Sequence, residues 1–289
     1  MSSASQIKWM CSRWMLTCTT RKSVRPHVRW IAFPIAAPGW RRAALPSARE
    51  EAARYLRRVQ LVFLHALPFD GRMWSVVKEG HDGGVLTPRL YDLGDSIEAW
   101  AAAVLQLAGP EPCVVVGCSV GGSCALEMAR AAPDQVAGIV LVGAKAGVRP
   151  DAAMRDEAIR VLETLGIEAA WDRYWAPLFG RKTPRAAVAA ARDLALSQDV
   201  GDLVRGVRAF HDRRNLTDWV ARWRRPLVVV NGAEDLTPPP SVTATLGAGP
   251  ARRAHVVPDC GHYVSLERPA LFQSILASTL ADPSLFALP

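Results

Sequence analysis

The sequence predicts an α/β fold, a doubly wound and mostly parallel sheet with an inserted helical cap. Short apolar runs alternate with helical segments from about residue 59 onward, as expected for strands covered by helices on both faces of a sheet. A central stretch has apolar residues at helical spacing and no strand candidate. Because the chain has 289 residues, half of them apolar, it can bury a substantial core.

Residues 1–58 are predicted to be a basic N-terminal extension, disordered or loosely docked. The first 60 residues contain twelve Lys and Arg against two Glu, a net charge of +10, so the rest of the chain carries −2. The overall charge of +8 therefore describes this segment, and the near-neutral body gives no reason to expect nucleic acid as a partner. Arg13 interrupts the apolar stretch of the segment, which argues against a secretion signal.

The remaining elements follow in order along the chain. Residues 59–147 and 226–289 are predicted to form the α/β core, and residues 148–225 are predicted to form the helical cap. The clearest predicted strands of the core are residues 59–64, 114–116, 139–142 and 227–230, and its predicted helices are residues 97–107, 122–131 and 270–280. Ligands bind beyond the carboxyl ends of the strands in open sheets of this kind, so the site is expected there.

The six cysteines indicate a reducing compartment. They include no C-x-x-C pair and no accompanying His spacing that suits a zinc site, so buried free thiols, no metal and a cytoplasmic location are expected. No apolar run approaches the roughly 20 residues that span a bilayer, so no membrane partner is expected either. The oligomeric state is left open.

Ser119 is the candidate nucleophile. It lies in the sequence Gly117-Cys-Ser-Val-Gly121, between a predicted strand and a predicted helix. A serine on such a sharp turn is exposed at the edge of the sheet, and the flanking glycines allow the close backbone approach that the turn needs. The helix N-terminus beside it favours the negative charge of a tetrahedral intermediate. A glycine-rich turn with an idle serine is the alternative, and the partners of Ser119 decide between the two.

Asp235 and His262 are the candidate acid and base. Asp235 comes shortly after the apolar run 227–230, and His262 follows a glycine in a loop ahead of the last predicted helix. Each alone has an ordinary structural explanation. A nucleophile, an acid and a base in this chain order, each just after a strand, match a known order of the serine hydrolase triad. Glu234 is the competing acid, but its neighbour fits the position better.

These residues resemble the α/β-hydrolase superfamily, over nearly all of residues 59–280. Three motifs carry the resemblance: the strand and His-Ala loop of residues 61–74, the turn around Ser119, and Gly261-His262 with Glu-Arg-Pro at 267–269. The chain looks most similar to the branch of small-molecule serine esterases, enol-lactonases and carbon-carbon bond hydrolases. The resemblance implies a hydrolase of the carboxylic ester or lactone type.

The resemblance also implies an oxyanion hole, made by the backbone N–H groups of Leu67 and Val120. His65 would then be a structural residue that holds this loop. The chain departs from the family at Ala66, where glycine is usual, and an alanine would be strained if the position needs positive φ. The family also has a hairpin before the first central strand, for which residues 30–35 are the only plausible strand here.

The combined pattern predicts a cofactor-independent serine hydrolase. His262 would take the Ser119 proton as the hydroxyl attacks a small-molecule carbonyl substrate, and water would then release the acyl group from Ser119. A carboxylic ester, a lactone and an activated carbon-carbon bond are all compatible substrates. A non-catalytic small-molecule receptor and a perhydrolase are alternatives on the same site. An alternative function of a different class is an interaction protein, in which the basic N-terminal segment binds an acidic partner.

Aromatic residues of the cap are the candidate substrate contacts. Trp171, Trp175 and Phe210 are predicted to line an apolar pocket above the nucleophile. Aromatic residues at helical spacing are also typical of a cap core, which is the competing explanation.

Overall fold

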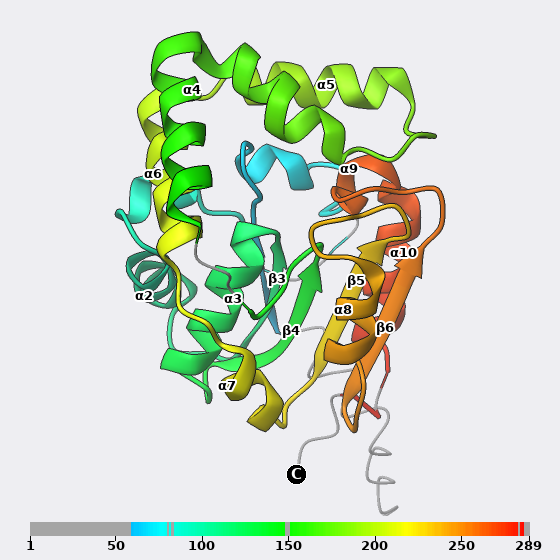
Figure 1. Ribbon diagram of the computed structural model, residues 1–289. Coiled ribbons are helices and arrows are strands. Elements are labelled where there is room, and N and C mark those ends of the chain that lie inside the picture. The colour runs from blue at the N-terminus through cyan, green and yellow to red at the C-terminus, as the bar shows by residue number, and fades with distance from the viewer. Residues whose placement is uncertain (1–58, 80, 82–83, 148–150, 283, 286–289) are drawn as a thin grey trace, which may run out of the picture. The chain divides into compact units, whose positions relative to one another are not determined.

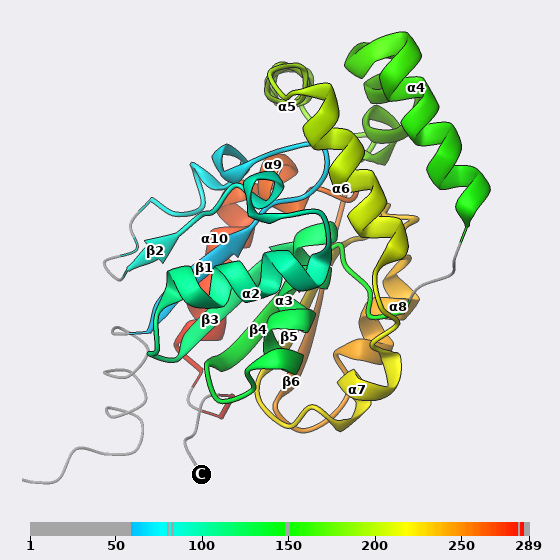
Figure 2. The ribbon, with the colours of Figure 1, turned by 90° about the vertical axis from the view of Figure 1, so that its left-hand side faces the viewer.

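The computed structural model describes residues 59–79, 81, 84–147, 151–282 and 284–285. The predicted extension 1–58 and its candidate strand at residues 30–35 lie outside the described residues. Within them, six parallel strands form one sheet in the order β2-β1-β3-β4-β5-β6. Figure 1 shows the strands β3 to β6, and Figure 2 also labels β1 and β2. The strands are β1 (Gln60–Leu64), β2 (Val85–Leu86), β3 (Cys113–Cys118), β4 (Val136–Val142), β5 (Leu227–Gly232) and β6 (Arg252–Val257).

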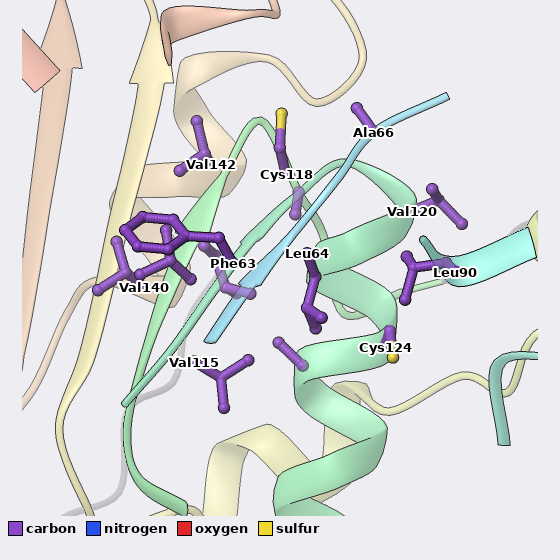
Figure 3. Packing of buried hydrophobic residues seen from close by; sticks show 14 of the residues in the cluster. Phe63, Leu64, Ala66, Leu90, Val115, Cys118, Val120, Cys124, Val140 and Val142 are labelled. Carbon is purple, nitrogen blue, oxygen red and sulfur yellow. The ribbon is translucent and has the colours of Figure 1, made fainter. Parts of the chain in front are cut away.

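The central strands are buried on both faces. Every residue of β3 and of β5 is buried, which explains why their sequences are continuous apolar runs and not alternating ones. The register places Val115 of β3 between Val62 of β1 and Ile139 of β4. Side chains from these strands and from the helix that follows β3 belong to one buried cluster, part of which is shown in Figure 3.

Helices cover both faces of the sheet. Helices α2 (Ile97–Ala108) and α3 (Val120–Ala131) lie on one face, and α10 (Pro269–Leu280) lies on the other, as Figures 1 and 2 show. The hydroxyl of Ser96 accepts a hydrogen bond from the Ala99 N–H and so caps the start of α2. The predicted doubly wound α/β fold is confirmed.

The segment predicted to be a cap is helical. Its helices α4 (Ala152–Ala170), α5 (Arg185–Leu196) and α6 (Val200–Asp212) lie above the carboxyl ends of the strands, whereas α7 (Thr217–Arg222) lies near the opposite end of the sheet (Figure 1). The segment also contains a π-helical turn η3 (Trp171–Trp175) and a 3₁₀ turn η4 (Ala176–Leu178). The division of the chain at residues 148 and 225 into a core and a cap remains a prediction.

Several short elements join the main ones around the site. They are two 3₁₀ turns, η1 (Gly71–Trp74) and η2 (Leu90–Leu93), and the helices α8 (Pro240–Leu246) and α9 (Val264–Glu267). In the part of the chain that is described, no helix has the length and apolar character needed to cross a membrane. The described cysteines, Cys113, Cys118, Cys124 and Cys260, are free and buried as expected. The cytoplasmic location inferred from them remains a prediction.

Candidate active site

Ser119 lies at the junction between β3 and α3. Its backbone φ of 52° is in the left-handed region that non-glycine residues rarely occupy. Hydrogen bonds hold it there: the Ser119 N–H donates to the Val142 carbonyl at 2.9 Å, and the Ser119 carbonyl accepts from the Gly122 N–H at 3.0 Å. A strained backbone that the surrounding structure enforces is typical of functional sites.

The two glycines that flank this turn are required by close backbone packing. A Cβ atom on Gly121 would lie 2.3 Å from the carbonyl oxygen of Leu64 on β1. A Cβ atom on Gly117 would lie 2.4 Å from the carbonyl oxygen of Gly121. Both distances are far below any real contact of a carbon atom, so the spacing of glycines around Ser119 follows from the geometry of the turn.

Asp235 and His262 form a buried hydrogen-bonded pair. The His262 Nδ1 and Asp235 Oδ2 atoms are 2.9 Å apart, and both residues are at most 3% exposed. The second carboxylate oxygen of Asp235 accepts a hydrogen bond from the Thr237 N–H at 2.8 Å. Since an ionised carboxylate can only accept, Nδ1 carries the proton, and Nε2 is left as the acceptor that a general base needs.

Glu234, the competing acid, has a different partner. Its Oε2 atom accepts hydrogen bonds from the Arg181 backbone N–H at 2.9 Å and from Arg181 Nε at 3.2 Å. The backbone hydrogen bond from Arg181 is the main cause that lowers the pKa of Glu234. This carboxylate is therefore engaged with the cap and not with His262, and the pairing favours Asp235 as the acid.

The loop after β1 carries the predicted oxyanion donor Leu67. Ala66 is not among the residues with positive φ, so alanine causes no backbone strain at this position. The loop turns at Ala66, whose carbonyl accepts from the Phe69 N–H at 2.8 Å. Among the described residues, no protein acceptor pairs with the N–H of Leu67 or of Val120, the first residue of α3. Neither amide is therefore engaged by another group of the described residues.

His65 is a structural residue of this loop. It is fully buried, its Nε2 accepts a hydrogen bond from the Leu90 N–H at 2.9 Å, and its Nδ1 lies 3.3 Å from the Ala66 carbonyl oxygen. Burial lowers the pKa of His65 to about 4, so the ring is neutral at pH 7 and its Nδ1–H can donate to Ala66. The residue anchors the loop and has no access to the cavity described below.

A cavity of about 180 Å³ lies between these loops and the cap. Ser119, Leu67, His262 and Tyr263 line it from the core. The cap lines it mainly with apolar residues, among them Met154, Leu162, Trp175, Leu178, Val207 and Phe210. The candidate nucleophile, the candidate base and one candidate oxyanion residue therefore line one largely apolar chamber.

The three aromatic residues predicted as substrate contacts separate into two groups. Trp175 and Phe210 line the cavity. Trp171 does not: it is 2% exposed and packs between the rings of Phe69 and Phe179, with centroid distances of 6.4 and 5.8 Å. Trp171 is thus part of the cap core, the competing explanation for these aromatics.

A sequence profile of the alpha/beta hydrolase family matches residues 61–273 of this chain. The match spans well over half of the chain and includes Ser119, Asp235 and His262. The chain belongs to the alpha/beta hydrolase family. The predicted superfamily is confirmed, and the predicted enzyme class, a hydrolase, agrees with this membership.

Similar proteins are known in sequence and in structure. This hydrolase is 28% identical over 248 residues to the pimeloyl-[acyl-carrier protein] methyl ester esterase of Aromatoleum aromaticum. The aligned region covers 74% of this chain and 95% of that relative. A thermophilic esterase from Thermogutta terrifontis superposes with a TM-score of 0.70 at 22% identity, covering 78% of this chain and 90% of the other. An enol-lactonase from Burkholderia xenovorans LB400 superposes with a TM-score of 0.68 at 20% identity, and the superposition covers 78% of this chain and 92% of the other.

Two residues of this hydrolase organise the site without having received a role from the sequence, although Glu267 belongs to the Glu-Arg-Pro motif of residues 267–269. Tyr263 is fully buried, and its hydroxyl donates to the Leu67 carbonyl at 3.1 Å. Glu267 is 3% exposed and accepts hydrogen bonds from backbone on either side of His262. Their nearness to His262 in the sequence was a signal, but Leu67, to which Tyr263 donates, and Gly180, which donates to Glu267, lie far away along the chain.

Proposed function

We propose that this protein is a serine hydrolase that cleaves small carboxylic esters through an acyl-enzyme on Ser119. One observation carries the proposal. Ser119 and His262 line the same cavity, and His262 is paired with the buried carboxylate of Asp235. A hydroxyl, a base and an acid that orients the base are the parts that nucleophilic acyl transfer requires.

The proposed reaction begins with proton transfer from the Ser119 hydroxyl to His262 Nε2 as the serine oxygen attacks the ester carbonyl carbon. The carbonyl oxygen becomes an oxyanion, which the free amides of Leu67 and Val120 can bind. His262 then protonates the leaving alcohol, and the acyl group remains on Ser119. A water molecule activated by His262 releases the acid in the second half of the cycle.

The cavity and the curated relative support an ester as substrate. The cap wall is largely apolar, which suits an alkyl or acyl chain better than a charged group. The name of the Aromatoleum aromaticum relative describes action on the methyl ester of a carrier-bound acyl chain. We therefore place a carboxylic ester with an apolar acyl part ahead of a lactone or a carbon-carbon bond.

The experiment is hydrolysis of 4-nitrophenyl butyrate by the full chain and by Ser119→Ala, with a fluorophosphonate probe and intact mass to locate the adduct. We expect a loss of activity of about 10⁵-fold in Ser119→Ala and an adduct on Ser119 in the wild type. A folded wild type with neither turnover nor adduct would contradict the proposal and favour the receptor. Formation of peracetic acid from hydrogen peroxide in acetate buffer would instead indicate a perhydrolase.

A further inference from the structure

The carboxylate of Glu267 bonds to the backbone on both sides of His262. Its Oε2 accepts from the Gly261 N–H at 2.9 Å, and its Oε1 accepts from the Tyr263 N–H at 3.0 Å. The residue sits at the end of α9, so its side chain reaches back over the turn that contains the base. One carboxylate therefore fixes the peptide group that follows His262 and the peptide group between Cys260 and Gly261, one residue before it.

The same carboxylate also holds a segment of the cap. Oε2 of Glu267 accepts a hydrogen bond from the Gly180 N–H at 2.8 Å and a second one from the Thr183 hydroxyl. In return, the His262 N–H donates to the Leu178 carbonyl at 2.8 Å. Leu178 lines the cavity, so this pairing joins the backbone of the base to one wall of the chamber.

Glu267 is buried with hydrogen-bond donors and without a cation. No Lys, Arg or His forms an ion pair with its carboxylate among the described residues. Four donors converge on two oxygens, and an ionised carboxylate is the side chain that accepts on both oxygens without donating. An amide of the same shape would present an NH₂ group to one set of these donors and would lose those bonds.

We propose that Glu267 is a positioning residue that couples the base to the cap. By fixing the peptides around His262, it sets the direction of the imidazole towards Ser119, and by fixing residues 178–183 it sets the position of the Leu178 wall. The side chain of Glu267 thus fixes the position of His262 relative to Leu178. The kinetic part of this proposal rests on the hydrolysis proposed above, because it assigns His262 the role of base.

The test compares three variants of the full chain. Glu267→Gln keeps the shape but removes one acceptor oxygen. Thr183→Val removes only the hydroxyl that joins the cap segment to the carboxylate. Glu127→Gln is the matched control: Glu127 is 2% exposed and pairs with Arg130 on α3, away from His262. Circular dichroism and thermal unfolding establish that each variant is folded before kcat and KM for 4-nitrophenyl butyrate are measured.

The contacts of Glu267 with the backbone around His262 and with Thr183 predict different kinetic changes. We expect Glu267→Gln to lower kcat by about 10- to 100-fold, because small displacements of a catalytic group cost on this order. We expect Thr183→Val to raise KM by about threefold to tenfold with kcat nearly unchanged, because the loss of one hydrogen bond affects the wall more than the base. Glu127→Gln should change stability and leave both constants near the wild-type values.

The resonance of the His262 Nδ1 proton provides a readout that a purely structural role would not move. This proton bridges to Asp235, so its downfield NMR signal should shift or broaden in Glu267→Gln and persist in Glu127→Gln. An unchanged signal together with an unchanged kcat in a folded Glu267→Gln would overturn the proposal. If Glu267→Gln does not fold, Thr183→Val decides, and wild-type KM in that variant would overturn the coupling to the cap.

The failure of the two proposals can be told apart. If the wild type has no turnover and no Ser119 adduct, the hydrolase proposal fails, while the imidazole signal still reports whether Glu267 positions His262. If the wild type turns over and Glu267→Gln matches it, only the positioning proposal fails.

Discussion

The hydroxyl of Tyr263 donates a hydrogen bond to the carbonyl oxygen of Leu67 at 3.1 Å and thereby joins the loop of the base to the oxyanion loop. The two residues are 196 positions apart in the chain. Tyr263 is fully buried, and its ring packs edge-on against Phe69 with centroids 5.0 Å apart. The peptide that follows the candidate oxyanion donor is therefore held by the neighbour of the candidate base.

Removal of this hydroxyl should affect catalysis more than stability. Tyr263→Phe keeps the ring packing and loses one hydrogen bond, which should lower the free energy of unfolding by about 1 kcal/mol. Because Leu67 is then free to shift by a fraction of an ångström, we expect kcat to fall by roughly 10-fold with little change in KM. Urea unfolding and steady-state kinetics measure the two effects.

Tyr91→Phe is the comparison for this prediction. The Tyr91 hydroxyl donates to the Phe69 carbonyl at 2.8 Å, so this variant loses a similar bond without cutting the connection to His262. Equal losses of kcat in Tyr263→Phe and Tyr91→Phe would show that the link between the two loops has no special role.

Neighbouring carboxylates should differ sharply in their effect on kcat. Asp235→Asn replaces the acceptor for His262 Nδ1 by a group that can donate to it, which favours the wrong tautomer, so we expect kcat to fall by about 10⁴-fold. Glu234→Gln changes only the contact with Arg181 and should keep kcat within about twofold of wild type. Burst and steady-state kinetics of both variants check this, and a large loss in Glu234→Gln would instead assign it the acid role.

Burial of neutral His65 should make stability depend on pH. Its folded pKa of about 4 lies below the ordinary 6.5, so the unfolded chain binds the extra proton first. The contribution of neutral His65 to the free energy of unfolding is therefore fully present above pH 6.5. It is lost progressively as the pH falls to about 4, by up to roughly 3 kcal/mol. Urea unfolding at pH 7.5, 6, 5 and 4 measures it, and His65→Gln should flatten the dependence. Parallel curves for the two proteins would contradict this assignment.

The turn at Ser119 should not tolerate a methyl group. Gly121→Ala brings a Cβ to 2.3 Å from the Leu64 carbonyl oxygen, so we expect a loss of about 3 kcal/mol of unfolding free energy or more, or insoluble protein. Gly84→Ala is the control because its Cβ would make an ordinary contact of 3.6 Å with Gln60, and its stability should stay within about 1 kcal/mol of wild type. Thermal unfolding compares them, and equal stability would show that the turn can relax.

The sequence predicts the parts of the fold that local patterns encode. The runs that become β1, β3, β4 and β5 are long and apolar enough to be recognised, whereas β2 has only two residues and no periodicity to detect. Ser119, Asp235 and His262 each follow a strand, so their meeting at one edge is a consequence of the parallel sheet.

Contacts between distant segments were beyond the reach of such patterns. The bond between Glu267 and Gly180 spans 87 positions, and the one between Tyr263 and Leu67 spans 196. Trp171 and Trp175 are four residues apart and would share a face of an α-helix. The structure winds them as a π-helical turn, with Trp171 in the cap core and Trp175 at the cavity.

The backbone pairing between Leu178 and His262 limits how freely the cap can be exchanged in protein engineering. A chimaera that takes all of residues 148–225 from another hydrolase would also replace the chain opposite the candidate base, and so would change both the chamber and the chemistry. A graft that ends before residue 178 and resumes after residue 183 would alter the chamber alone. Specificity and reactivity can be redesigned separately in this protein only if those six residues are kept.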